Sequence, residues 1–566
     1  MKNKNLNLIN MGRTDYSFFK KTGLAAFAMV VSIVSGMATQ LDVTTTAPGT
    51  LATLISENDK WNITELKVSG PLNGFDIRTL RDMAGADLYG APTEGKLEKL
   101  DMAGVNIIGY DESLSASDQT YYIDNSQGIM YLIGENDKFR GRFFAGCNVL
   151  KELTIPDNAF LGVNQGWPEG LEKISVSNNN PNLTVVDNIL YSKDLKTLFY
   201  CPAKSPQTSI RTPEATEIVE SYAFYQNLHL QSVEMPNIKE IKSFAFSYCN
   251  ALQTLSFGNY LATWGDMAIM GNYQLSSVTV AADNPNFKNI GNSLTDISGR
   301  TLYIFAADNT VEACGVPEGV ETICSGAIYS NHIRTATFPN SVTTLRQYAI
   351  FNSLYLETIH MGSGLTNLEP MFSYNLPSLQ EYDVDSENPV FASYNGAIYS
   401  KDGLTLTIIP EGKKEFNVKE GTEQLGIYCL GAINNIIETL TLPASLKTLA
   451  SMTLSCNSLK EIYCKATVPP TSNGYLPFYS FMAANIDLFV PTGCADAYKN
   501  SLEWRDFRSI SEFDSSDIDG VTASEKPYEV ARYSIDGKRL PAETPGLNLI
   551  KMSDGSVQKV WVPGNR

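Results

Sequence analysis

The feature that most constrains the fold is a 25-residue pattern that the chain carries three times at a fixed interval. The copies are NNPNLTVVDNILYSKDLKTLFYCPA (179–203), DNPNFKNIGNSLTDISGRTLYIFAA (283–307) and ENPVFASYNGAIYSKDGLTLTIIPE (387–411). Their central prolines, Pro181, Pro285 and Pro389, follow one another at an interval of 104 residues both times. A fixed interval indicates repeats that stack, because a single repeat cannot bury its apolar face alone.

A shorter motif lies within this long repeat: an apolar residue followed by two more at the third and fifth positions after it. Examples are LQSVEM (230–235), LQTLSF (252–257), LSSVTV (275–280) and LETIHM (356–361). Neighbouring motifs are 22 or 23 residues apart, except where one of the long copies intervenes. The alternation predicts a short strand with one buried face, and the interval is typical of a leucine-rich solenoid. We therefore expect Leu252, Leu255 and Phe257 to point into a core.

The long copies are inserts of about 35 residues in this solenoid. In the third insert, two alternating segments, 396–400 and 404–410, are separated by Lys401, Asp402 and Gly403. Asp-Gly between alternating segments is a strong hairpin signal. The predicted fold is thus a β-rich α/β solenoid: a leucine-rich repeat array with a parallel strand ladder, three projecting β-hairpin inserts and a small all-β C-terminal module.

The repeat resembles a known family. The segment IKSFAFSYCNALQTLSF (241–257) is similar to the repeat of BspA-like leucine-rich repeat proteins of bacterial surfaces, and the inserts resemble the hairpin-bearing variants of that family. The segment 466–510 resembles the part that closes such arrays. The resemblance covers roughly residues 45–513. It implies secretion or surface display and a binding role, and it does not transfer a ligand.

The two ends of the chain predict export. Lys20 and Lys21 precede the apolar segment TGLAAFAMVVSIVSGMA (22–38), which reads as a signal peptide ending at Ala38. We expect a signal peptide at 1–38, an N-terminal cap with irregular repeats at 39–125, the solenoid at 126–513, a polar linker at 514–526 and the β module at 527–566. The expected location is the outside or the cell surface of a Gram-negative bacterium.

The C-terminal module supports two interpretations. YSIDGKRL (533–540) and PGLNLIKMSDGSVQKV (545–560) resemble the sorting domains of the Gram-negative type IX secretion pathway. The alternative is a small β-domain that caps the chain.

Charge and motif content exclude several classes of function. The formal net charge is −18 and no long run of Lys or Arg occurs, which disfavours nucleic acid as a partner. After residue 38, no segment is apolar over the length of a membrane span. His229, His332 and His360 lie in different repeats, so no pair has metal-ligand spacing. We predict a protein that is not an enzyme, with no catalytic residue, cofactor or metal.

Nine cysteines are too sparse for a disulfide scaffold. Cys147, Cys249 and Cys456 each precede an Asn shortly before a strand motif. We expect these three to be small buried side chains.

The expected function is binding of a macromolecular partner, in adhesion or host interaction, through the outward face of the strands. Polar residues dominate the outward positions and Tyr463 is a rare aromatic there, which favours a protein over a glycan. The candidate partner-binding residues are Gln231, Glu234, Gln380, Glu381 and Asp383. Rival hypotheses are a secreted glycan-binding or glycan-processing protein, a structural surface-layer component, and binding through the inserts. The pattern specifies neither the partner's identity, nor calcium dependence, nor an oligomeric state.

Overall fold

The computed structural model describes most of the chain after residue 38. The described residues are 39–109, 121–124, 129–132, 136–161, 166–306, 311–330, 332–430, 435–454, 456–472, 477, 480–514, 529–534, 539–540, 544–552 and 557–562. The predicted signal peptide and residues 515–526 of the predicted linker lie outside these ranges. The chain divides into two compact units, and the boundary between them follows Tyr374.

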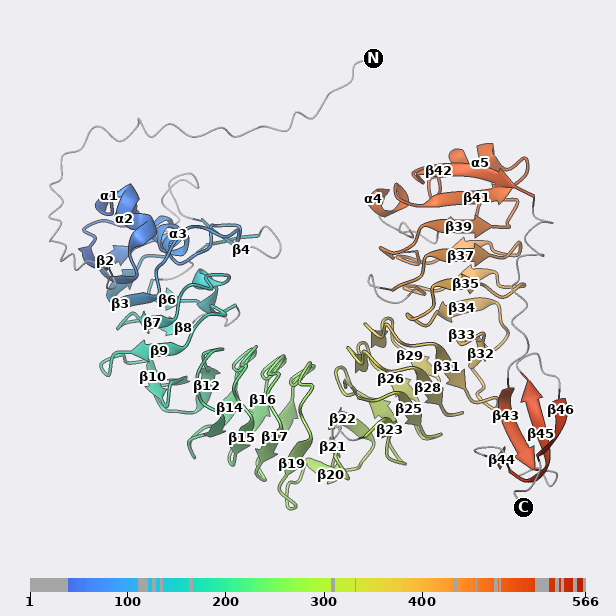
Figure 1. The fold of residues 1–566 in the computed structure, drawn as a ribbon. Helices are drawn as coiled ribbons and strands as arrows, with labels where there is room; N and C mark the ends of the chain where they lie inside the picture. The colour runs from blue at the N-terminus through green and yellow to red at the C-terminus, as the bar shows by residue number, and fades with distance from the viewer. Residues whose placement is uncertain are drawn as a thin grey trace, which may run out of the picture. The chain divides into compact units, whose positions relative to one another are not determined.

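The repeat motifs of the first unit form parallel ladders of strands, seen stacked in Figure 1. The first sheet contains β1 (Gln40–Thr44), β2 (Glu65–Leu72), β3 (Lys99–Ile107), β7 (Glu152–Ile155) and β9 (Lys173–Val176). The second sheet contains β13 (Ser209–Arg211), β15 (Ser232–Met235), β17 (Thr254–Phe257) and β19 (Ser277–Val280). The third sheet contains β23 (Ala313–Gly315), β25 (Thr335–Phe338) and β28 (Thr358–Met361). Leu255 pairs with Val233 and Val278 in its neighbours. Leu252, Leu255 and Phe257 are buried, which confirms the predicted register.

The strands of each insert begin a second ladder, which continues through the following turns. In the first insert β10 (Leu183–Val186), β11 (Ile189–Ser192) and β12 (Thr197–Tyr200) are antiparallel, and β12 continues in parallel to β14 (Ile218–Val219), β16 (Glu240–Ile241) and β18 (Thr263–Trp264). The second insert does the same with β20 (Phe287–Ile290), β21 (Ser293–Asp296), β22 (Thr301–Phe305), β24 (Thr322–Ile323), β26 (Thr344–Leu345) and β29 (Asn367–Leu368). The hairpins are confirmed, but they do not project from the solenoid. Leu190 and Leu198 are fully buried, because each insert supplies core and the first strands of a sheet.

The repeated Asn-Pro has a specific structural role at the start of each insert. Asn180 is fully buried, and its Nδ2 donates to the carbonyl oxygens of Pro156 and Ala159, each at 3.1 Å. Its Oδ1 accepts from the backbone N–H groups of Asn182 and Leu183, at 2.7 and 2.8 Å. The side chain therefore ties the insert to the preceding turn of the solenoid with all its hydrogen-bonding capacity used.

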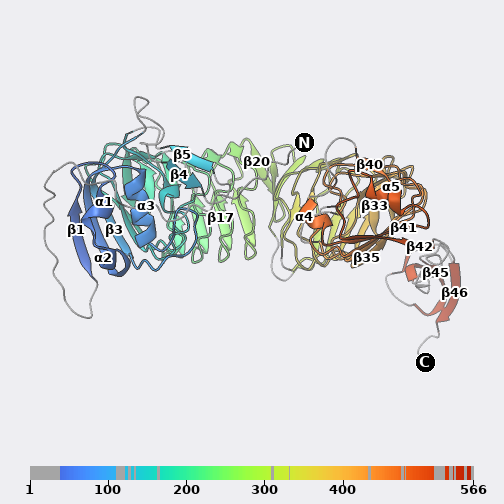
Figure 2. The same ribbon diagram turned by 90° about the horizontal axis from the view of Figure 1, so that it is seen from above.

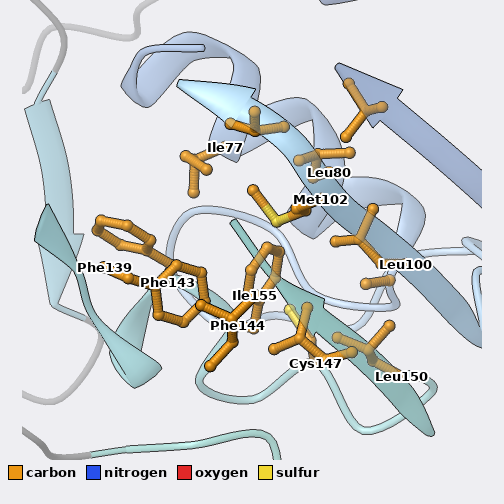
Figure 3. Packing of buried hydrophobic residues seen from close by; sticks show 14 of the residues in the cluster. Ile77, Leu80, Leu100, Met102, Phe139, Phe143, Phe144, Cys147, Leu150 and Ile155 are labelled. Carbon is orange, nitrogen blue, oxygen red and sulfur yellow. The ribbon is translucent and has the colours of Figure 1, made fainter. Parts of the chain in front are cut away.

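Helices gather at the N-terminal end of the first unit, where Figure 2 shows them beside β1 and β3. They are α1 (Leu51–Leu54), α2 (Glu57–Asn62) and α3 (Gly74–Met83). In α3, Asn73 and Asp76 form a capping box, and Ile77 and Leu80 are buried. These side chains pack with those of β3 and of the 3-10 helix Gly141–Phe144, including Phe143 (Figure 3).

Short paired strands complete the first unit. They are β4 (Tyr121–Asp124) with β5 (Ile129–Leu132), β6 (Lys138–Phe139) with β8 (Phe160–Leu161), and β27 (Ile350–Phe351) with β30 (Ser373–Tyr374).

The second unit repeats the two-ladder plan. Its motif strands are β31 (Glu381–Val384), β35 (Glu415–Asn417), β37 (Thr439–Leu442), β39 (Glu461–Cys464), β41 (Asp487–Pro491) and β42 (Ser509–Phe513), with α4 (Ser480–Ala483) and α5 (Ala495–Lys499) near the end of the solenoid. Its insert ladder contains β32 (Phe391–Tyr394), β33 (Ala397–Ser400), β34 (Thr405–Ile408), β36 (Gln424–Leu425), β38 (Thr448–Leu449) and β40 (Thr471–Ser472). A separate antiparallel sheet follows in the order β44 (Arg539–Leu540), β43 (Glu529–Ser534), β45 (Gly546–Met552) and β46 (Val557–Val562). The predicted all-β character of the C-terminal module is thereby confirmed.

Candidate functional site

The outward side chains of the motif strands form a polar surface in each unit, which we call the ladder face. In β15 and β17 the inward residues are buried, whereas Glu234 and Thr254 are exposed. Parallel pairing places each outward residue beside its equivalent on the next turn, as Glu234 lies beside Ser256. Neighbouring strands are about 4.8 Å apart, so these side chains form closely spaced rows.

Opposite charges on neighbouring turns pair along the ladder face. Lys99 Nζ on β3 lies 3.2 Å from Glu65 Oε1 on β2 and 3.5 Å from Glu152 Oε1 on β7. These two carboxylates raise the pKa of the Lys99 ammonium. Lys460 and Glu438 form a similar pair at 2.8 Å in the second unit. Pairs this exposed add little stability, so their main consequence is that much of the charge is compensated within the surface.

A hollow of about 240 Å³ lies on the ladder face over β1, β2, β3 and β7. Its charged lining residues are Glu65, Lys67, Lys99, Asp101 and Glu152. The sequence analysis did not select these residues. The signal was available, since ITELKV (63–68) and LEKLDM (97–102) follow the repeat motif and place charges at outward positions.

The five predicted partner-binding residues are all exposed, and they are divided between the two units. Gln231 and Glu234 belong to the first unit, whereas Gln380, Glu381 and Asp383 belong to the second. Glu234 forms an ion pair with Arg211, and Gln380 Nε2 donates to the carbonyl oxygen of Gly412 at 2.9 Å. Their role in partner binding stays a prediction.

Aromatic rings interrupt the polar surface in the second unit. Tyr463 on β39 stacks on Phe489 of β41 with ring centroids 4.5 Å apart, and Phe513 of β42 meets Tyr463 edge-on at 5.9 Å. The sequence analysis singled out Tyr463 alone. Phe489 and Phe513 occupy alternating positions in DLFVP (487–491) and SISEF (509–513). This alternation would have allowed their outward position to be predicted from the sequence.

Across the described residues, no group of three or more His, Cys, Asp or Glu side chains is placed to hold a metal ion. The nine cysteines are unpaired thiols. Cys147, Cys249 and Cys456 are buried, as predicted. Burial raises the pKa of the Cys147 thiol, and likewise that of Cys201, to about 12. Such thiols stay protonated at neutral pH and are poor nucleophiles.

The repeat region matches the family model of the BspA type leucine rich repeat region in six copies, over residues 196–295, 301–419 and 410–489. The chain belongs to this family. The resemblance predicted from the repeat motif is therefore confirmed. BspA-type proteins are leucine-rich repeat proteins that are typically secreted or at the cell surface, and the family is generally non-catalytic.

Several solved structures have some similarity to this BspA-type chain. A leucine rich cell surface protein of Faecalibacterium prausnitzii is 15% identical, with 61% of this chain and 98% of that chain covered and a TM-score of 0.34. The pneumococcal vaccine antigen PcpA is 14% identical, with 69% and 82% covered and a TM-score of 0.31. A leucine-rich repeat protein of Eubacterium ventriosum is 18% identical, with 60% and 89% covered and a TM-score of 0.30. Scores this low add nothing to the family assignment.

A search of curated proteins finds no significant relative. Within the described ranges, none of the helices has the length and apolar character needed to cross a bilayer.

Proposed function

We propose that this chain is a secreted or surface-displayed, non-catalytic solenoid that binds a protein partner through its ladder face, in adhesion or in host interaction. The observation that carries the proposal is the regular presentation of polar side chains from successive turns, with the hollow over β1, β2, β3 and β7 as a recess in it. Extended surfaces of stacked repeats are the usual binding surfaces of solenoids. The paired charges favour a partner with interspersed charges of both signs over a polyanion.

The proposal includes export from a Gram-negative bacterium. Residues 1–38 would be removed as a signal peptide, and residues 527–566 would act as a type IX sorting module. Deleting 527–566 should then leave the protein in the periplasm. Normal surface display of the truncated protein would make the module a cap only.

The binding proposal is tested with the full-length exported protein as bait against host and bacterial surface extracts, followed by affinity measurement with the purified captured protein. Joint replacement of Gln231, Glu234, Gln380, Glu381 and Asp383 by Ala should weaken that affinity. Exposed replacements away from structural contacts change stability by less than about 0.5 kcal/mol each. This variant also loses the Glu234–Arg211 ion pair and the Gln380–Gly412 hydrogen bond, so its unfolding is measured beside its affinity.

A matched control replaces two lysines at equivalent places in the inserts, Lys193 and Lys401, whose Nζ atoms donate to backbone carbonyls of Asn178 and Ser386 at 2.9 and 2.8 Å. This variant should bind like the wild type. If it loses affinity while the ladder variant does not, the inserts bind the partner and the ladder proposal is wrong. Self-assembly of the purified protein into sheets, with no captured partner, would favour a structural surface layer.

A further inference from the structure

A second recess lies in the first unit, where the loops that precede the motif strands meet. It is open to solvent and has a volume of about 450 Å³. Its lining includes five polar side chains and one ring: Asn148, Glu169, Lys204, Gln226, Asn250 and Tyr248. We call it the corner pocket. It is separate from the ladder face, because its residues precede the motif strands rather than occupy their outward positions.

The five polar side chains of the corner pocket make no polar contacts that stabilise the fold. Among the residues that the structure describes, none of the five has a hydrogen bond or ion pair through its side chain. Glu169 and Lys204 line the same recess and carry opposite charges, yet they form no pair with each other. This contrasts with the ladder face, where Lys99 and other charges find partners on the next turn. Gln226 is half-buried and the other four are exposed, so these donors and acceptors are open to solvent and available to a ligand.

Two residues of the corner pocket differ in type from their equivalents in other turns. Gln226 and Tyr248 have φ angles of 56° and 61°, in the left-handed region that disfavours such side chains. At the equivalent place in other turns the chain has Gly271, Asn352 or Asn375, which are residue types that accept this conformation. Large side chains also have positive φ elsewhere in the repeat, as at Phe244, Met267 and Tyr348, so this conformation belongs to the repeat and marks no single site.

The repeat itself does not require these side chains. One interval of 104 residues later, Ser330 and Asn352 stand in the places of Gln226 and Tyr248. The Asn352 N–H bonds to the carbonyl oxygen of Tyr374 as the Tyr248 N–H bonds to that of Met270. The Ser330 N–H differs from that of Gln226, because it donates to the Ser353 hydroxyl and not to a backbone carbonyl. The corner pocket is therefore a local addition to a common framework.

Neighbouring residues hold the Tyr248 ring in place. A Cβ atom at Gly271 would come within 2.7 Å of its Cδ1, so the glycine of the next turn makes room for the ring. Tyr225 meets the ring edge-on, with centroids 5.8 Å apart. Tyr225 also lines a smaller adjoining hollow with Trp167, and that hollow shares Glu169 and Gln226 with the corner pocket. The site thus has a fixed aromatic wall beside its polar groups.

We propose that the corner pocket binds a neutral oligosaccharide. One carboxylate and one ammonium leave it without net charge, which gives no attraction for a polyanion or polycation. Three carboxamides and the two charged groups offer directional donors and acceptors that match vicinal hydroxyls. The Tyr248 ring and Leu228, which is 47% exposed, offer apolar surface to the C–H groups of a sugar ring.

Two alternatives fit the corner pocket less well. A peptide is usually held by a free strand edge, a hydrophobic groove or a deep anchor pocket, whereas this lining is mostly polar. Hydrolysis of a glycosidic bond ordinarily needs a pair of carboxylates, whereas Glu169 is the only carboxylate among the lining residues. The geometry therefore assigns binding without cleavage.

The test uses the full-length protein in isothermal titration calorimetry with four neutral probes: maltohexaose, cellohexaose, mannohexaose and xylohexaose. A heparin hexasaccharide is the polyanionic counter-probe. We expect saturable binding of at least one neutral probe and none of heparin. Binding of heparin alone, or of no probe, would overturn the proposal.

Variants locate the binding. The double variant Gln226→Gly, Tyr248→Asn installs residue types that the backbone favours, so it should fold while its affinity falls at least about tenfold. Tyr248→Phe keeps the ring and should bind within about twofold of wild type. Gln253→Ala, on the ladder face, is the matched control. Unchanged affinity in the double variant would refute the assignment. A protein partner bound by the ladder face should be insensitive to these changes, so the two proposals can fail separately.

Discussion

The buried asparagine at the start of each insert offers the sharpest test of the fold. In the second insert, Asn284 is 2% exposed. Its Nδ2 donates to the carbonyl oxygens of Gly258 and Leu261 at 3.2 and 3.0 Å. Its Oδ1 accepts from the N–H groups of Asn286 and Phe287, each at 2.8 Å. Replacing Asn284 with Ala removes four hydrogen bonds and leaves their backbone partners unpaired.

The expected loss follows from these contacts. A hydrogen bond contributes about 0.5–1.5 kcal/mol net, so four bonds amount to about 4 kcal/mol. Because repeat arrays need not unfold in one step, the loss should be concentrated around β20, β21 and β22. A loss of about 4 kcal/mol in opening free energy lowers amide protection there about a thousandfold.

Hydrogen–deuterium exchange measured by mass spectrometry on the full chain reads this out segment by segment. The control is Asn259→Ala, which removes one surface bond to Asp283 at 3.1 Å and should cost less than about 0.5 kcal/mol. Asn284→Asp keeps the acceptor but sets a carboxylate against two carbonyl oxygens, so its defect should be smaller at acidic pH, where the carboxyl is protonated. If Asn284→Ala protects its amides as well as Asn259→Ala does, the asparagine does not tie the insert to the preceding turn.

Three further predictions concern the core, one exposed ion pair and the thiols. Leu255→Asp places an unpaired charge in the core and should abolish protection of β15, β17 and β19 in the same exchange measurement; wild-type protection would show that the register is wrong. Hydrogen bonding to Arg508, at 2.8 Å from Nε, lowers the pKa of the Asp487 carboxyl to about 2. The ionised Asp487 carboxylate therefore stabilises the fold above the unfolded pKa near 4, and this stabilisation is lost as pH falls toward 2. In urea unfolding, Asp487→Asn should be less stable than the wild type by under about 1 kcal/mol at pH 7 and equally stable near pH 2. A difference in stability that does not depend on pH would contradict this. Cys249, whose pKa is raised by burial, should resist iodoacetamide in the native protein and react once unfolded, and rapid native labelling at this position would show an open core.

The sequence predicted the core well, because alternation along a strand directly records which side chains are buried. Leu252 and Leu255 could be placed inward without knowing any neighbour, and the structure agrees. The family could likewise be recognised from the recurring register of the motif. The Asp402–Gly403 turn was also readable, since Gly403 has φ +76°.

The second ladder could not be read in the same way. Strands such as β14 and β16 contain two residues each, which is too short for any alternation to appear. They form because β12, the last strand of the insert, has one edge free to pair with β14, and β14 then pairs with β16. The first hairpin of the third insert was missed although Asn395 and Gly396, with φ 50° and 77°, are a strong signal for a two-residue turn.

The sequence by itself determined the repeat, its period, the inward residues and the family, because these follow from local patterns of burial and turn formation. Tertiary structure alone decided which side chains meet. Lys99 reaches Glu65 and Glu152, and Gln226 and Tyr248 share a pocket with Glu169, only because stacked turns bring together positions that lie twenty or more residues apart. The period fixes which turns are neighbours, but the exact stacking of the turns determines whether two side chains pair, as on the ladder face, or stay apart around a recess, as in the corner pocket.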